Sequence, residues 1–156
     1  MKLTHIDGKG RPRMVDVSGK IETERTARAC GEIRLAHETL ELIAENAVPK
    51  GEVLNTARLA GIQAAKRASE WIPLCHPLRL THIDVTVVPM PGEELVRVTA
   101  TVKAVDRTGV EMEALTAVAA ACLTVYDMCK AVDKRMVIGG IHLVSKEGGK
   151  SGPFTW

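Results

Sequence analysis

Apolar and polar residues alternate along three stretches of this chain, residues 23–35, 81–88 and 95–105. Each stretch therefore has one apolar and one polar face, which indicates a β-strand with one buried side. The turn-forming residues 89–93 (PMPGE) separate the second stretch from the third, so these two should form an antiparallel hairpin. A fourth apolar run, 136–144, predicts another strand. The Gly139-Gly140 pair inside that run marks a bulge or a close backbone approach.

Three other segments carry apolar residues at the 3.6-residue spacing of an α-helix. The first covers residues 37–47 and is stopped by Pro49, whereas the second opens at Lys50 and Gly51 and ends at Pro73. The third is residues 109–134, whose middle part is almost entirely small and apolar. A helix that is apolar around most of its circumference is buried on most sides, so we expect this segment at the centre of the fold.

The resulting order is strand, helix, helix, strand, strand, helix, strand. Without one of the first two helices this is the βαββαβ pattern of a ferredoxin-like sandwich. We therefore predict an α+β fold with a ferredoxin-like antiparallel sheet, helices on one face and one additional helix. The uncovered face of the sheet should carry Ala and Val as well as polar positions, which favours self-association. Residues 1–156 should form one domain, with about 1–14 and 146–156 flexible.

Composition narrows the choice of function. The chain has 156 residues, of which 46% are hydrophobic and 26% charged, as in ordinary globular proteins. Its net charge of +2 is a mild bias towards anionic ligands and far from the charge of a nucleic-acid-binding domain. No apolar run approaches the length of a membrane span, and the N-terminus lacks the apolar region of a secretory signal. We therefore expect a cytoplasmic location and no membrane or nucleic-acid partner.

Ionisable residues flank both ends of the predicted central helix. Glu113 and Asp127 are 14 residues apart, which corresponds to about 21 Å along a helix axis. One small-molecule site in one subunit could not easily use both. Either the two carboxylates serve different roles, or two copies of the helix bring opposite ends together. We favour the second, although Glu113 can equally be a favourable acid in a first helical turn.

Asp127 and Lys130 form the more informative cluster, because an i,i+3 spacing places them on one helical face. An exposed pair of this kind can be an ordinary surface ion pair of little energetic value. Their apolar neighbours instead suggest shifted pKa values and proton transfer, and the nearby Lys134 and Arg135 suggest a phosphate-bearing substrate. Lys50 is a further phosphate-binding candidate or a solvated turn lysine.

Other candidate sites are weaker. Gly149-Lys150-Ser151 lacks the earlier glycine and the following helix of a P-loop. The cysteines and histidines do not have the paired spacing of a zinc site, so we expect no bound metal. Cys75 and His76 are adjacent in sequence, which rarely gives a nucleophile and its base. His76 alone is either a structural histidine or a site residue in a proline-constrained loop.

Six segments of this chain resemble the molybdenum cofactor biosynthesis protein C family, the cyclic pyranopterin monophosphate synthases. They are MVDVSGK at 14–20, VPKGEVLNTARLAGIQAAK at 48–66, IPLCHPL at 72–78, GVEMEALTAV at 109–118, YDMCKA at 126–131 and GGKSG at 148–152. The resemblance covers essentially the whole chain, with no departure at the matching positions. It implies a ferredoxin-like hexamer, a trimer of dimers with sites between subunits.

The resemblance also implies an activity. Members of this family act as lyases in molybdenum cofactor biosynthesis. They convert (8S)-3′,8-cyclo-7,8-dihydroguanosine 5′-triphosphate to cyclic pyranopterin monophosphate and release diphosphate. By motif match, Asp127 resembles the catalytic aspartate, and Lys50 and Lys130 resemble the essential lysines. The residues that resemble substrate-contacting positions are Leu74, Cys75, His76, Met112 and Glu113. No cofactor is implied, apart from an Mg²⁺ ion that could accompany the triphosphate.

The alternative to an enzyme is a non-catalytic ligand-binding protein of the same fold. RNA-binding sheets of this shape need exposed aromatic residues, and only 3% of this chain is aromatic. A ligand-sensing oligomer is harder to separate from an enzyme, because it too would bury an Ala-rich helix between subunits. Such a module would bind the nucleotide without consuming it.

Overall fold

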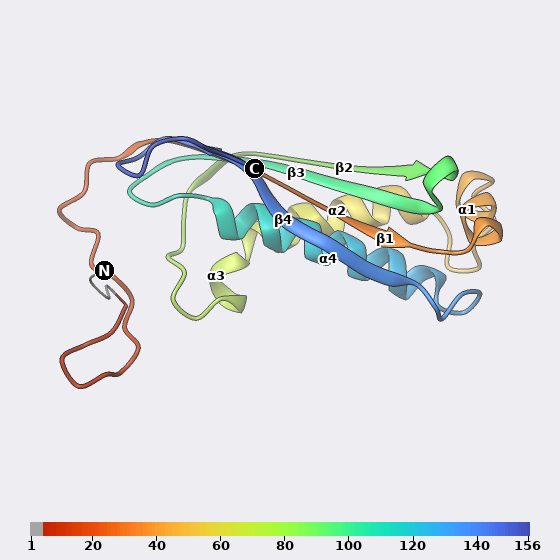
Figure 1. The fold of residues 1–156 in the computed structure, drawn as a ribbon, viewed down its shortest axis with the longest axis horizontal. Helices are drawn as coiled ribbons and strands as arrows, with labels where there is room; N and C mark the ends of the chain where they lie inside the picture. The colour runs from red at the N-terminus through yellow and green to blue at the C-terminus, as the bar shows by residue number, and fades with distance from the viewer. Residues whose placement is uncertain (1–4) are drawn as a thin grey trace.

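The computed structural model describes residues 5–156 and contains one five-stranded antiparallel sheet. The sheet has the order β2-β3-β1-β4-β5. Its strands are β1 (Thr23–Arg34), β2 (Leu80–Met90), β3 (Leu95–Asp106), β4 (Val137–Glu147) and β5 (Phe154–Thr155). Figure 1 shows the sheet as one layer, with the two long helices side by side along one of its faces. The first four strands have the predicted ferredoxin-like arrangement, so the predicted fold class is confirmed.

The helical layer is built mainly from α2 (Val53–Lys66) and α4 (Glu111–Cys129). Two shorter helices, α1 (His37–Ala44) and α3 (Ala68–Trp71), lie at opposite ends of this layer (Figure 1). A 3₁₀ turn, η1 (Pro91–Glu93), closes the β2–β3 hairpin. The sequence predicted α4 because its apolar pattern is continuous, and most of its residues from Ala114 to Cys129 are indeed buried.

The start and end of the second helix differ from the prediction. Gly51 has a φ of 94° and its N–H bonds to Val48 O at 2.9 Å, so Lys50 and Gly51 belong to a turn. The helix begins only after Glu52, whose side chain accepts hydrogen bonds from Leu54 N and Asn55 N. It ends at Lys66, since the next residue leaves helical geometry with a φ of −117° and separates α2 from α3.

The core lies between the sheet and the helices. Ala27, Ala29 and Ile33 of β1 are fully buried, and they lie opposite the equally buried Val102, Ala100 and Val96 of β3. Gly31 lets α4 approach this strand, because a Cβ atom there would lie 2.7 Å from Val118 Cγ1. The predicted bulge is also present: the β1–β4 register shifts opposite Gly140, whose φ is 62°.

The open face of the sheet was predicted correctly for Val and wrongly for Ala. Every Ala of β1 and β3 faces the helices and is buried, because these residues form the core. The other face carries polar or charged residues, as at Arg28 and Glu32, together with the exposed Val88, Val105 and Val137. Large apolar residues are also exposed on the helical side, where Leu59, Trp71 and Leu123 are further candidates for subunit contact.

The C-terminal segment forms a strand that its glycine-rich sequence did not predict. Phe154 and Thr155 pair with Lys146 and Ser145, and Trp156 N donates to Val144 O at 2.9 Å. Near the other end of the chain, residues 5–22 extend away from the sheet and helices (Figure 1). Residues 1–4 lie outside the described part, and the flexibility expected for both termini stays a prediction.

Helix α4 is also long and apolar enough to cross a membrane, contrary to the expectation that no segment approaches that length. Length and composition alone are weak grounds, since core helices satisfy the same test. In this protein 56% of the apolar window is buried inside the fold. The structure thus accounts for the hydrophobicity of α4 by its packing against the sheet and α2.

Candidate functional site

Asp127 lies between two lysines that come from different parts of the chain. It occupies the last turn of α4, Lys130 directly follows that helix, and Lys50 lies in the turn before α2. Lys130 Nζ is 2.6 Å from Asp127 Oδ1, and Lys50 Nζ is 2.7 Å from Oδ2. Lys50 Nζ also donates to the Asp127 backbone carbonyl at 2.9 Å. The structure therefore brings together all three residues predicted to be catalytic, which we call the Asp127 cluster.

The charges of the Asp127 cluster follow from these contacts. Hydrogen bonds from Lys130 and then Lys50 lower the pKa of Asp127 to about 2, and Asp127 in turn raises the pKa of Lys130. At neutral pH the cluster thus holds one carboxylate and two ammonium groups. Apolar surroundings, which the sequence suggested as the cause of such shifts, are not their cause, because all three side chains are about half exposed. The contacts between Asp127 and the two lysines are the main cause.

This arrangement has a chemical consequence. While both lysines bind the carboxylate, Asp127 is a poor proton acceptor. A phosphate that draws one ammonium group towards itself would remove part of that stabilisation and make the carboxylate more basic. A shallow cavity of about 350 Å³ between α2, α3 and α4 ends at Asp127 and leaves room for a ligand beside it. Its lining also includes Gln63, Arg67, Trp71 and Thr124.

Glu113 lies at the other end of α4 and is almost completely buried, with 3% of its surface exposed. Cys75 Sγ donates to its Oε1 at 3.5 Å, whereas Oε2 is buried and has no hydrogen-bond partner. Burial raises the pKa of Glu113, and burial together with this carboxylate raises the pKa of Cys75 to about 11. Glu113 is a first-turn acid of α4, as the sequence suggested, but burial disfavours its charged form.

The pKa of Glu113 predicts a specific dependence of stability on pH. Because folding raises this pKa, the folded state prefers the neutral carboxyl, and the preference is fully satisfied below the unfolded pKa near 4.5. As the pH rises through the folded pKa, ionisation of the buried group destabilises the fold. We expect Glu113→Gln to be more stable than the wild type at pH 7, by about 1 kcal/mol, with little difference at pH 4.

Urea denaturation at both pH values measures this difference. Glu38→Gln is the matched control, because Glu38 is a first-turn acid of α1 but is exposed. It should show no such gain. A Glu113→Gln variant that is less stable than the wild type at pH 7 would mean that the buried carboxylate is stabilised in the fold.

The other predicted residues gather near Glu113. Leu74, Cys75 and His76 belong to the loop before β2, and Met112 precedes Glu113 in the first turn of α4. His76 Nε2 is 2.8 Å from the backbone carbonyl of Val15, so this imidazole ties the N-terminal segment to the loop. Cys75 contacts Glu113 and the His76 carbonyl and makes no bond to the imidazole. A Cys75–His76 nucleophile pair is therefore absent from the geometry.

A larger cavity of about 650 Å³ opens at this same end of α4. Its wall includes Glu111 and the Gly148–Ser151 stretch, and five of its lining residues are cationic: Lys20, Arg25, Arg107, Lys146 and Lys150. Lys146 Nζ is 2.8 Å from Glu111 Oε1. We call this the basic cavity. Its volume and charge suit a phosphate-bearing ligand of nucleotide size.

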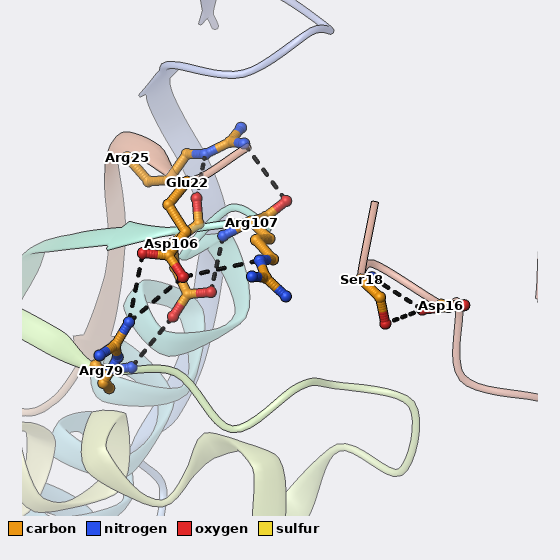
Figure 2. A network of polar contacts seen from close by, with 7 residues as sticks. All are labelled: Asp16, Ser18, Glu22, Arg25, Arg79, Asp106 and Arg107. Carbon is orange, nitrogen blue, oxygen red and sulfur yellow. Dashed lines mark hydrogen bonds and ion pairs between the residues drawn. The ribbon is translucent and has the colours of Figure 1, made fainter. Parts of the chain in front are cut away.

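Figure 2 shows the polar network beside the basic cavity. Arg25 donates to the backbone carbonyls of Asp106 and Arg107, which fixes its position on β1. Glu22 contacts both Arg79, at 3.4 Å, and Arg107 Nε, at 3.7 Å. The second distance is too long for a hydrogen bond, and Arg107 Nε is buried without such a partner. The network thus fixes Arg25 and Arg107 at the cavity wall, and some of their N–H groups remain able to donate hydrogen bonds to a ligand.

Sequence reasoning missed most of the basic cavity. Its cations come from the N-terminal segment, β1, the β3–α4 loop, β4 and the loop after β4, and no short motif contains them. The family-like segments MVDVSGK, GVEMEALTAV and GGKSG each contain part of the wall, but nothing in them predicted that they meet. Gly149-Lys150-Ser151 lies in the loop between β4 and β5 with no helix after it, so it is a cavity wall and not a P-loop.

The two ends of α4 are separate in one chain. Glu113 and Asp127 are about 21 Å apart along the helix, and the linings of the two cavities share no residue. Within residues 5–156 there is also no group of three or more His, Cys, Asp or Glu side chains placed to hold a metal ion. Cys122 and Cys129 are fully buried, and burial raises their pKa values to about 12 and about 11.

Comparison with known proteins gives one consistent result. Residues 14–149 match the model of the MoaC family. A cyclic pyranopterin monophosphate synthase of Roseiflexus sp. (strain RS-1) is 58% identical over 153 residues, which are 98% of this chain and 97% of that relative. The proteins of the same name from Pelotomaculum thermopropionicum and Brucella ovis are 59% and 57% identical, over 97% and 99% of this chain and 89% and 93% of theirs.

Proposed function

Since this chain belongs to the MoaC family, we propose that it is a cyclic pyranopterin monophosphate synthase in molybdenum cofactor biosynthesis. The substrate would be (8S)-3′,8-cyclo-7,8-dihydroguanosine 5′-triphosphate, and the products cyclic pyranopterin monophosphate and diphosphate. This makes the enzyme a phosphorus–oxygen lyase. The observation that carries the proposal is the Asp127 cluster, in which one carboxylate is held between two ammonium groups.

The Asp127 cluster supports a division of roles. Lys50 and Lys130 would bind the triphosphate, and their movement towards it would free Asp127 to transfer protons while the guanine-derived ring opens and rearranges. A ribose hydroxyl then gives up its proton to the Asp127 carboxylate and attacks the innermost phosphorus. A new P–O bond forms, the bond to the next phosphate breaks, and diphosphate leaves with the electron pair. Cations around the phosphates would stabilise the charge that develops in this step.

We further propose that each complete site contains two subunits. One subunit would supply the Asp127 cluster, and another the basic cavity with Leu74, Cys75, His76, Met112 and Glu113. The separation along α4 supports this, because one chain cannot place both ends on one small molecule. The exposed Leu59, Trp71 and Leu123 on the helical side support close contact between copies. A hexamer built as a trimer of dimers would satisfy both requirements.

The proposal needs no cofactor and no metal bound by the protein. An Mg²⁺ ion would belong to the triphosphate and enter with it. The proposal also assigns the enzyme to the cytoplasm, without a membrane or nucleic-acid partner. The burial of α4 supports the first part of this assignment, and the low aromatic content of the chain, 3%, supports the second.

A turnover assay tests the proposed reaction. The wild-type protein should convert the enzymatically prepared cyclic triphosphate, and diphosphate and the pterin product should appear in equal amounts. Equimolar release is expected because one attack on the innermost phosphorus forms the ring phosphate and expels diphosphate. Binding of the substrate without diphosphate release would refute the synthase and support a ligand-sensing protein instead.

A further inference from the structure

The open face of the sheet carries a cysteine and a histidine in contact. Cys30 of β1 pairs with His142 of β4 in the strand register, and its Sγ lies 3.5 Å from Nε2 and 3.8 Å from Nδ1. The Nδ1 atom is also 2.6 Å from the backbone carbonyl of Gly140, at the β4 bulge. A carbonyl only accepts hydrogen bonds, so Nδ1 carries the proton of the neutral ring. The lone pair of Nε2 is then left to accept the thiol proton.

The charged groups around Cys30 favour the approach of an anionic small molecule. Burial raises the pKa of this thiol, while the guanidinium groups of Arg97 and then Arg28 act in the opposite direction, and Glu32 adds to the burial effect. Arg97 comes from β3 and is also paired with Glu93 at 2.9 Å. Because burial keeps the free thiolate scarce, reaction of Cys30 depends on a base next to it. His142 is in that position.

An aromatic ring also restrains the imidazole of His142. The ring of Trp156, the last residue, packs against it with centroids 4.9 Å apart. Trp156 is itself anchored by the bond from its N–H to Val144 O. His142 therefore has a hydrogen bond on one side and an aromatic ring on another, which limits the orientations in which it can meet the thiol.

None of the other three cysteines has this environment. Cys75 lies beside the Glu113 carboxylate, which disfavours its thiolate. Cys122 and Cys129 are fully buried in α4. All four lie within residues 5–156, and Cys30 alone combines partial exposure, a neighbouring base and flanking cations.

We propose that Cys30 is a site of S-thiolation by small anionic disulfides such as glutathione disulfide. His142 Nε2 accepts the thiol proton, and Sγ attacks one sulfur of the disulfide. The Cys30–sulfur bond forms as the original S–S bond breaks, and the other half leaves as a thiolate that takes the proton from the imidazolium. The disulfide is the oxidant and is reduced to one thiol. Its carboxylates would face Arg28 and Arg97.

Peptide mass spectrometry of the folded, full-length protein tests this site. The protein is exposed at equal concentration either to glutathione disulfide or to cystamine, a cationic disulfide, and modification is followed at all four cysteines. We expect Cys30 to react first, with glutathione disulfide ahead of cystamine. His142→Gln should slow the Cys30 reaction at least about tenfold, because it removes the base. Modification of Cys75 before Cys30, or an unchanged Cys30 rate in His142→Gln, would overturn the proposal.

Arg97→Gln provides a second test that keeps the thiol and the base. It should narrow the preference for the anionic disulfide over the cationic one, since one of the two flanking cations is lost. An unchanged preference would contradict the assigned ligand class. In every variant, Cys122 and Cys129 should stay unmodified, which shows that the protein is folded during the reaction. If Cys122 and Cys129 become modified in His142→Gln, that variant is unfolded. The Arg97→Gln result then decides whether the proposal for Cys30 holds.

Discussion

Replacing Asp127 by Asn is expected to reduce kcat by about a thousandfold, the middle of the range for loss of a general acid or base. The amide keeps the size of the side chain but cannot accept a proton. Lys50 keeps its bond to the backbone carbonyl of residue 127, at 2.9 Å, and both lysines keep the charge that binds the phosphates. KM should therefore change much less than kcat. Parallel measurement of diphosphate and pterin product gives both constants.

Asp84→Asn is the matched control for this substitution. Asp84 is also an exposed carboxylate in an ion pair, with Arg58 at 3.4 Å, but it lies on β2 away from the Asp127 cluster. Its removal should leave turnover close to that of the wild type. If correctly folded Asp127→Asn protein kept near-normal turnover, Asp127 would not be the proton-transfer group.

The same geometry limits what Asp127 can contribute to a pH profile. Its pKa of about 2 in the free enzyme means that it stays ionised throughout the physiological range. A change of kcat/KM between pH 5 and 8 would thus report another group, because this parameter follows the free enzyme and free substrate. A change of kcat alone can still involve Asp127, since bound phosphates would compete for its lysines.

The fold could be predicted where the decisive interactions are local. Alternation marked β1 and β3, because every second residue of each strand enters the same core. The unbroken apolar pattern marked α4. Strand β5 could not be found in this way, since it has two residues and exists through pairing with the edge of β4. The open face was misjudged only for Ala, because every Ala residue of β1 and β3 belongs to the core.

The candidate site also has parts that local sequence predicts and parts that depend on tertiary contacts. The contact between Asp127 and Lys130 follows from an i,i+3 spacing at the end of one helix. Lys50 is 77 residues from Asp127, and only the likeness of two separate segments to one family suggested that they act together. The cations of the basic cavity come from five segments, so their meeting is a property of the tertiary fold. The local sequence pattern therefore predicts the Asp127–Lys130 contact, but not the position of Lys50 and little of the basic cavity.

Mixing two inactive variants is expected to restore activity if each site contains two subunits. Asp127→Asn removes the carboxylate at one end of α4, and Glu113→Gln removes it at the other. In a randomly mixed oligomer, about a quarter of the sites would combine an intact Asp127 from one subunit with an intact Glu113 from another. A site formed within one chain would never contain both, because each chain lacks one of them.

The experiment refolds the two variants together and measures turnover, while native mass spectrometry confirms that mixed oligomers form. Lys146→Gln, which alters the same basic cavity, replaces Glu113→Gln if that variant is active alone. A mixture of Asp127→Asn and Lys130→Gln is the matched control: both changes lie in one cluster, so no mixed site is intact and no activity should return. Mixed oligomers of the first pair that are as inactive as the separate variants would show that the two ends of α4 do not share a site.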